Sequence, residues 1–159
     1  MEQTQTQIDI AAPASLVWAI LSDFRTYQRW NPLMRGVQGR PASGANVEIR
    51  LSSPPGADVK VRSTVVRMSE PREIRLRDHF AVPGLFNSER RFRIEALPNG
   101  GVRFHHGEQA WGILVFLFSR RRTLRGRNGL EAMNAALKRR AERACADEAP
   151  PTGAWGVQA

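Results

Sequence analysis

A histidine, a carboxylate and an arginine are the residues of this sequence best placed to do chemistry together. Strand residues alternate between two faces, so Arg90 shares a face with Phe92, and His106 and Glu108 share one with Phe104. If the apolar side chains face a core, the three polar side chains lie on one inner wall. There they would polarise a carbonyl group and transfer a proton. Such chemistry suits an aldol cyclisation or a dehydration.

Two other interpretations of these three residues stay open. In one, Arg90 and Glu108 pair across neighbouring strands and His106 completes the hydrogen bonding, because buried charges need partners. In the other, the same groups bind the polar end of a ligand. Arg90, His106 and Glu108 are therefore catalytic candidates only. We take a binding protein without catalysis as the first expectation.

The segments that must position these residues alternate apolar and polar side chains, as β-strands do. A weaker alternation occupies residues 4–10 near the N-terminus. The Pro98-Asn99-Gly100-Gly101 sequence is a hairpin signal, and short turns between successive strands predict an antiparallel sheet. The other strands are expected at residues 45–51, 59–68, 72–80, 86–97 and 102–111.

Three helices are expected around this sheet. Pro13 opens a helix over residues 13–21, and a second short helix follows over residues 24–29. The last helix is expected to begin near Asn128 and to carry an apolar stripe that includes Met133. One amphipathic helix on one sheet predicts a two-layer α+β fold, in which the bent sheet wraps the helix and leaves a cavity.

Length and cysteine content bound the organisation. The 159 residues suit one domain, expected over residues 1–145, with a disordered tail over residues 146–159. The single cysteine, Cys145, allows no intrachain disulfide. No histidines, cysteines and carboxylates occur at metal-ligand spacing, so neither a metal nor another cofactor is expected. The polar N-terminus and the short apolar run at residues 113–118 predict a cytoplasmic protein.

The formal charge of +9 invites a nucleic-acid partner. The basic residues are spread along the chain, however, and no aromatic-rich RNA-recognition motif accompanies them, which argues against nucleic acid. The sequence leaves open whether the protein is a monomer or a homodimer.

Several short motifs resemble the START-like superfamily, and in particular the bacterial SRPBCC or polyketide cyclase/dehydrase subgroup. They are the segments at residues 8–13, 27–32 and 104–108. The resemblance implies an α+β helix-grip fold: a curved antiparallel sheet of six to seven strands around a long C-terminal helix, two short helices after the first strand, and an internal apolar cavity. One departure is Arg90, which stands where the subgroup often has a histidine, so no role of that histidine transfers.

The resemblance also implies that the chain binds a hydrophobic small molecule, such as a lipid, an isoprenoid or an aromatic polyketide, as a carrier or sensor. The alternative is a cyclase or dehydratase that uses His106 and Glu108. The expected ligand-binding residues are Trp30, Asn31, Ile49, Leu51, Val65, Leu76, Leu85, Phe92, Phe104, His106, Met133 and Leu137.

A third hypothesis concerns residues 113–127, where an apolar run precedes a basic cluster. Apolar burial beside basic side chains suits a membrane-surface or protein-docking module, with peripheral membrane contact through Arg120, Arg121 and Arg122. The simpler interpretation is a strand end followed by a solvated basic turn.

Overall fold

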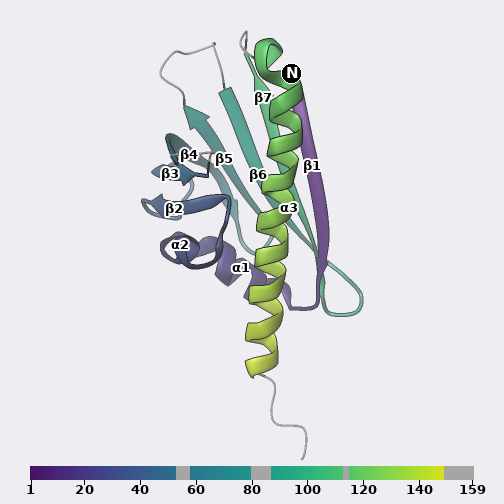
Figure 1. The fold of residues 1–159 in the computed structure, drawn as a ribbon. Helices are drawn as coiled ribbons and strands as arrows, with labels where there is room; N and C mark the ends of the chain where they lie inside the picture. Colours follow the sequence, from purple (N-terminus) through teal and green to yellow (C-terminus); the bar gives the residue numbers. More distant parts are fainter. Residues whose placement is uncertain (53–57, 80–86, 113–114, 149–159) are drawn as a thin grey trace, which may run out of the picture.

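A seven-stranded antiparallel sheet and one long helix dominate the computed structural model of this chain (Figure 1). The structure describes residues 1–52, 58–79, 87–112 and 115–148, and within the long helix it describes side chains from residue 126 onward. The predicted α+β helix-grip architecture is confirmed.

Six of the strands form a meander in chain order, and the first strand is added at the edge beside the last one. The spatial order of the sheet is β1-β7-β6-β5-β4-β3-β2, and all neighbours are antiparallel. The β6–β7 turn follows from Gly100, whose φ of +84° favours glycine. The strands are β1 (Glu2–Ile10), β2 (Met34–Gln38), β3 (Asn46–Leu51), β4 (Val59–Ser69), β5 (Glu73–His79), β6 (Asn87–Ala96) and β7 (Val102–Trp111).

Short helical segments connect β1 to β2 at one end of the sheet. They are α1 (Ala14–Ser22), a 3₁₀ turn (Phe24–Thr26) and α2 (Tyr27–Trp30). Pro13 lies at the N-cap of α1, where its missing N–H costs nothing. The inward side of these segments is apolar, so they bury Leu21 against the core.

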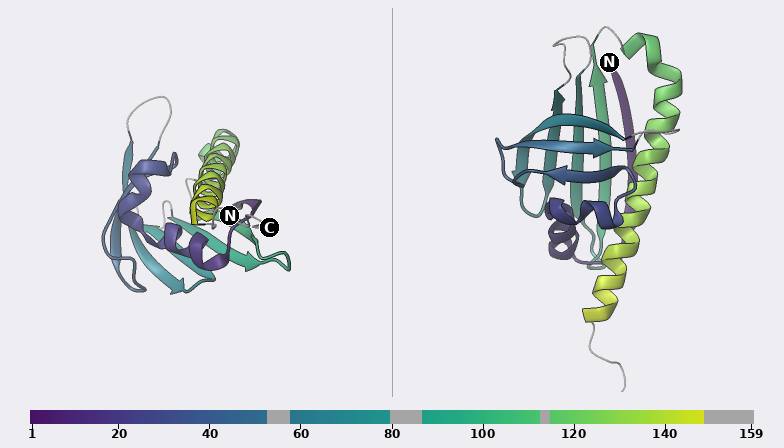
Figure 2. Two further views of the ribbon diagram at one scale, coloured as in Figure 1. Left: turned by 90° about the horizontal axis from the view of Figure 1, so that it is seen from below. Right: turned by 60° about the vertical axis from the view of Figure 1, so that its left-hand side comes forward.

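The long helix α3 (Val115–Glu148) lies on the concave side of the sheet, along β1 and β7 (Figure 2). Its inward stripe of Leu130, Met133, Leu137 and Ala141 is fully buried, which is the burial expected of an amphipathic helix. Gly129 brings the helix close to Leu33, since a Cβ there would lie 2.9 Å from the Leu33 Cδ1 atom.

One strand and one helix boundary differ from the sequence prediction. Strand β2 was not expected, because a register shift between Met34 and Gly36 breaks the two-residue alternation. The helix α3 begins at Val115 rather than near Asn128, so Gly126 is accommodated at a cost of about 1 kcal/mol relative to alanine. The simpler interpretation of residues 113–127, a strand end followed by a solvated basic turn, is therefore wrong from Val115 onward.

The predicted C-terminal tail and docking segment are only partly described. Helix α3 continues past the expected boundary at residue 145 to Glu148, and residues 149–159 lie outside the described structure. Arg120, Arg121 and Arg122 belong to α3, but their side chains are not among those described, so the docking hypothesis stays a prediction. No helix in the described chain combines the length and apolar character needed to cross a bilayer.

Candidate functional site

The three chemically promising side chains lie together on the concave face of the sheet. In the β6–β7 register, Arg90 pairs with Glu108 and Phe92 pairs with His106. Arg90 is only 2% exposed and His106 only 1%. This placement agrees with the side-chain alternation expected from the sequence.

Arg90 faces two carboxylates, one of which the sequence analysis did not identify. Its Nη2 atom lies 3.7 Å from Asp78 Oδ2 and 3.7 Å from Glu108 Oε2. Asp78 also accepts hydrogen bonds from the hydroxyls of Ser63 at 2.6 Å and Ser88 at 2.7 Å. We call these five residues the inner polar cluster. The alternation Ile74, Leu76, Asp78 would have placed Asp78 on the inner face.

Part of the hydrogen-bonding capacity of Arg90 is unused. Its Nε and Nη1 atoms are buried and have no hydrogen-bond partner among the protein atoms of the described residues. Burial disfavours the charged guanidinium, but attraction to Asp78 and Glu108 outweighs that effect and raises the pKa of Arg90 above its usual value. Arg90 is therefore a permanent buried cation, and two of its nitrogen atoms are available to a ligand as far as the described residues show.

A hydrogen-bond chain fixes the ring of His106. Its Nδ1 atom lies 3.0 Å from the Asn134 side-chain oxygen on α3. The Asn134 amide nitrogen donates to Thr6 Oγ1, which donates to the His106 backbone carbonyl. Because the Asn134 oxygen can only accept, Nδ1 carries the proton and the buried Nε2 presents a lone pair. That Nε2 atom has no hydrogen-bond partner in the described part of the chain.

The surroundings of His106 keep it neutral. Burial is the main cause and the positive charge of Arg90 adds to it. Together they lower the pKa of His106 from 6.5 to about 3, against the opposite effect of the hydrogen bonds that His106 makes to Asn134 and to the Leu130 backbone. An imidazole with so low a pKa is a weak proton acceptor near neutral pH. It remains a good hydrogen-bond acceptor.

Most of the expected apolar wall is buried in the core. The rings of Phe92 and Phe104 are stacked 6.1 Å apart, and Phe92 lies 4.7 Å from the His106 ring. Leu51 is only partly buried, and Leu85 lies outside the described residues. The wall residues that are at most 1% exposed are Ile49, Val65, Leu76, Phe92, Phe104, Met133 and Leu137.

Trp30 and Asn31 lie at the end of α2. The Asn31 side-chain oxygen accepts hydrogen bonds from the backbone N–H groups of Leu33 and Met34, at 3.0 and 2.9 Å. This bonding gives Asn31 a role in shaping the entry into β2. Trp30 packs edge-on against Tyr27, and its indole N–H is buried without a partner in the described structure.

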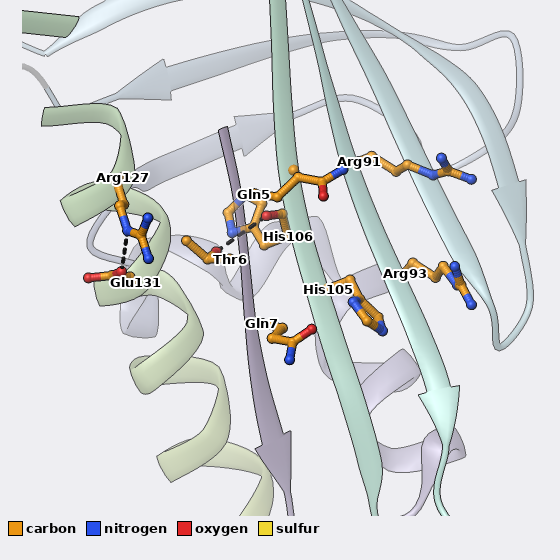
Figure 3. Close-up of a pocket in the computed structure, with 10 residues that line it drawn as sticks. Gln5, Thr6, Gln7, Arg91, Arg93, His105, His106, Arg127 and Glu131 are labelled. Carbon is orange, nitrogen blue, oxygen red and sulfur yellow. Dashed lines mark hydrogen bonds and ion pairs between the residues drawn. The ribbon is translucent and has the colours of Figure 1, made fainter. Parts of the chain in front are cut away.

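A polar hollow of about 400 Å³ lies elsewhere, around the edge strand β1 (Figure 3). Figure 3 shows Arg127 and Glu131 of α3 on one side of β1, and His105 and Arg93 on the other. Of the expected ligand-binding residues, His106 alone lines it. This hollow is therefore distinct from the apolar cavity that the sequence predicted.

Comparison with known proteins gives a family and a fold. The family model described as polyketide cyclase/dehydrase and lipid transport matches residues 1–147. No curated protein matches the chain.

Solved structures with low sequence identity share the architecture. A START superfamily protein from Mycobacterium smegmatis is 23% identical, with a TM-score of 0.69 over 89% of this chain and 98% of its own. A norcoclaurine synthase point mutant from Thalictrum flavum is 8% identical, with a TM-score of 0.70 over 90% and 95%. The di-domain ARO/CYC BexL is 16% identical, with a TM-score of 0.69 over 94% of this chain and 51% of its own.

Proposed function

This chain belongs to the polyketide cyclase/dehydrase and lipid-transport family, and from that premise we propose that it binds a hydrophobic small molecule between α3 and the concave face of the sheet. Both halves of the family's description concern molecules with large apolar surfaces. The α+β helix-grip fold offers such a molecule an apolar wall on each side, from the sheet and from the buried stripe of α3.

One observation carries this proposal: a fully buried arginine has two nitrogen atoms, Nε and Nη1, without a hydrogen-bond partner among the described residues. A buried donor without a partner costs about 1–3 kcal/mol, and more for a charged group, so proteins rarely retain one without a use. A ligand with an apolar body and one polar end would use these donors. Phe92 and Phe104 beside them would contact its body.

Chemical shifts of methyl groups test this proposal directly. We expect 2-naphthol, an aromatic probe that is neutral at pH 7, to shift the methyl signals of Val65 and Leu76, which face the interior. Val66 is the matched control, because it is the next residue in β4 and is 38% exposed. The proposal fails if no interior methyl signal moves at millimolar probe, or if Val66 moves as much as Val65.

A cyclase or dehydratase is the second candidate, and the free donors of Arg90 favour it because they would polarise a substrate carbonyl. The low pKa of His106 counts against that residue as the general base. Glu108, with a side chain 20% exposed, is then the candidate base. Once a substrate is identified, Glu108→Gln should abolish turnover and leave binding, whereas a pure carrier would show no turnover to lose.

A further inference from the structure

The inner face carries an acceptor and donors that have no partner among the described residues. His106 Nε2 is buried, unprotonated and without a partner among the described residues, because its Nδ1 proton is committed to Asn134. Arg90 Nε and Nη1 are the donors. The two side chains are diagonal neighbours, since Arg90 pairs with Glu108 and His106 pairs with Phe92. Diagonal positions are about 7–8 Å apart at the backbone, within reach of one ligand group between long side chains.

The guanidinium of Arg90 already faces negative charge in the protein itself. Asp78 is 1% exposed and faces Arg90 at 3.7 Å, so the buried guanidinium has its own counter-ion. Glu108 adds a second carboxylate at the same distance. A further anion buried here would lack a dedicated cation, and burying an unpaired charge is costly. The site therefore suits a neutral group better than a carboxylate or phosphate.

We infer that the ligand carries a neutral hydroxyl group, as in an alcohol, a phenol or an enol, whose oxygen accepts from Arg90 and whose proton is donated to His106 Nε2. This inference rests on the proposed function, because it specifies the polar end of the same hydrophobic ligand. A fatty-acid carboxylate or a phosphate group does not meet the requirement, since neither presents a neutral donor and acceptor on one oxygen at pH 7.

Four naphthalene probes separate the alternatives by isothermal titration calorimetry at pH 7. They are 2-naphthol, 2-methoxynaphthalene, 2-naphthoate and naphthalene. The methoxy compound keeps the acceptor but lacks the donor, and the naphthoate carries a negative charge. We expect 2-naphthol to bind about tenfold more tightly than each of the others, the difference made by one or two well-formed hydrogen bonds.

The variant His106→Phe removes the acceptor and keeps a ring beside Phe92 and Phe104. We expect it to bind 2-naphthol and 2-methoxynaphthalene equally. His105→Phe is the matched control, because His105 is the neighbouring residue on the outer face and should keep the tenfold preference. In the unsubstituted protein, the ¹⁵N signal of His106 Nε2 should shift with 2-naphthol and not with 2-methoxynaphthalene, and this readout needs no variant.

The outcomes separate the two proposals. If all four probes bind with equal affinity, or if 2-naphthoate binds most tightly, the hydroxyl inference is overturned and hydrophobic binding stands. If none binds, the proposed function itself fails. A preference for 2-naphthol that survives in His106→Phe would also overturn the inference, since the donor would then be recognised elsewhere.

Discussion

The two faces of the sheet combine arginines and carboxylates in opposite proportions. Arg90 and Arg91 are neighbours in β6, yet the side chain of Arg90 is 2% exposed and that of Arg91 is 51% exposed. Arg91 pairs with Glu73, which also contacts Arg67 and Arg75. On the outer face, one carboxylate is thus shared by three arginines.

On the concave face, carboxylates outnumber arginines. One arginine faces two carboxylates at 3.7 Å, and two of its nitrogen atoms have no partner in the described structure. The outer ion pairs are partly exposed, so water can hydrogen-bond to any donor or acceptor that lacks a protein partner. The inner cluster has no such substitute, so its unused donors carry an energetic cost. Loss of the arginine should therefore cost more stability on the concave face than on the outer face.

The largest expected effect is the loss of the buried cation. Arg90→Met leaves Asp78 as an unpaired buried charge, so the free energy of unfolding should fall by about 3–5 kcal/mol. Arg91→Met should change it by about 1 kcal/mol or less, because Arg67 and Arg75 still contact Glu73. Urea denaturation of both variants measures the difference. Equal losses would show that the two faces do not differ as described.

A smaller effect on stability is expected when the pH is lowered, because His106 is buried in its neutral form. The pKa of His106 is about 3 in the folded protein, whereas the ordinary value of 6.5 applies to the unfolded chain. Between these two pH values the unfolded chain therefore binds more protons than the folded protein. The contribution of the neutral His106 ring to the free energy of unfolding is therefore complete above about pH 6.5. It decreases as the pH falls below that value, by up to about 1.4 kcal/mol per pH unit.

Urea denaturation between pH 7 and pH 5 isolates this contribution, because the carboxylates whose pKa is lowered, such as Glu73, act below this range. His106→Gln should flatten the slope over this interval. His105→Gln controls for the loss of an imidazole as such. An unchanged slope in His106→Gln would contradict the buried neutral ring.

The smallest effect concerns an outer ion pair. Arg77 Nη2 lies 2.9 Å from Glu89 Oε2 across β5 and β6, with the two side chains 47% and 20% exposed. A double-mutant cycle with Arg77→Met and Glu89→Gln should give a coupling energy of about 0.2–1 kcal/mol that decreases toward zero in 1 M NaCl. The same cycle on Arg90 and Asp78 should give a larger coupling that salt hardly changes. Similar salt sensitivity of the two coupling energies would show that the inner and outer ion pairs do not differ in their exposure to solvent.

Much of the fold could be predicted because its signals are local. Alternating side chains placed six strands close to their observed bounds, and Pro13 located the first helix. Strand β2 was missed because it is short and contains a register shift at Gly36. The start of α3 was misplaced because Gly126 and the apolar run before it resemble a break between elements, whereas helix propagation tolerates a single glycine.

The site was predictable only in part. Alternation along β6 and β7 placed Arg90, His106 and Glu108 on one face, since that periodicity is a property of each strand. The partners that decide their chemistry come from elsewhere in the chain: Asp78 from β5 and Asn134 from α3. Their contributions depend on strand order and on the side of the sheet that the helix covers.

The sequence by itself thus determined the family, the alternation of the strands and which side chains face inward, because these follow from local periodicity and short motifs. Only the tertiary structure decided that His106 is neutral with its Nε2 lone pair free, and that Arg90 has its own counter-ion and two unused donors. The physical reason is that protonation states and hydrogen-bond balance are set by burial and by neighbours distant in sequence, which no local pattern encodes.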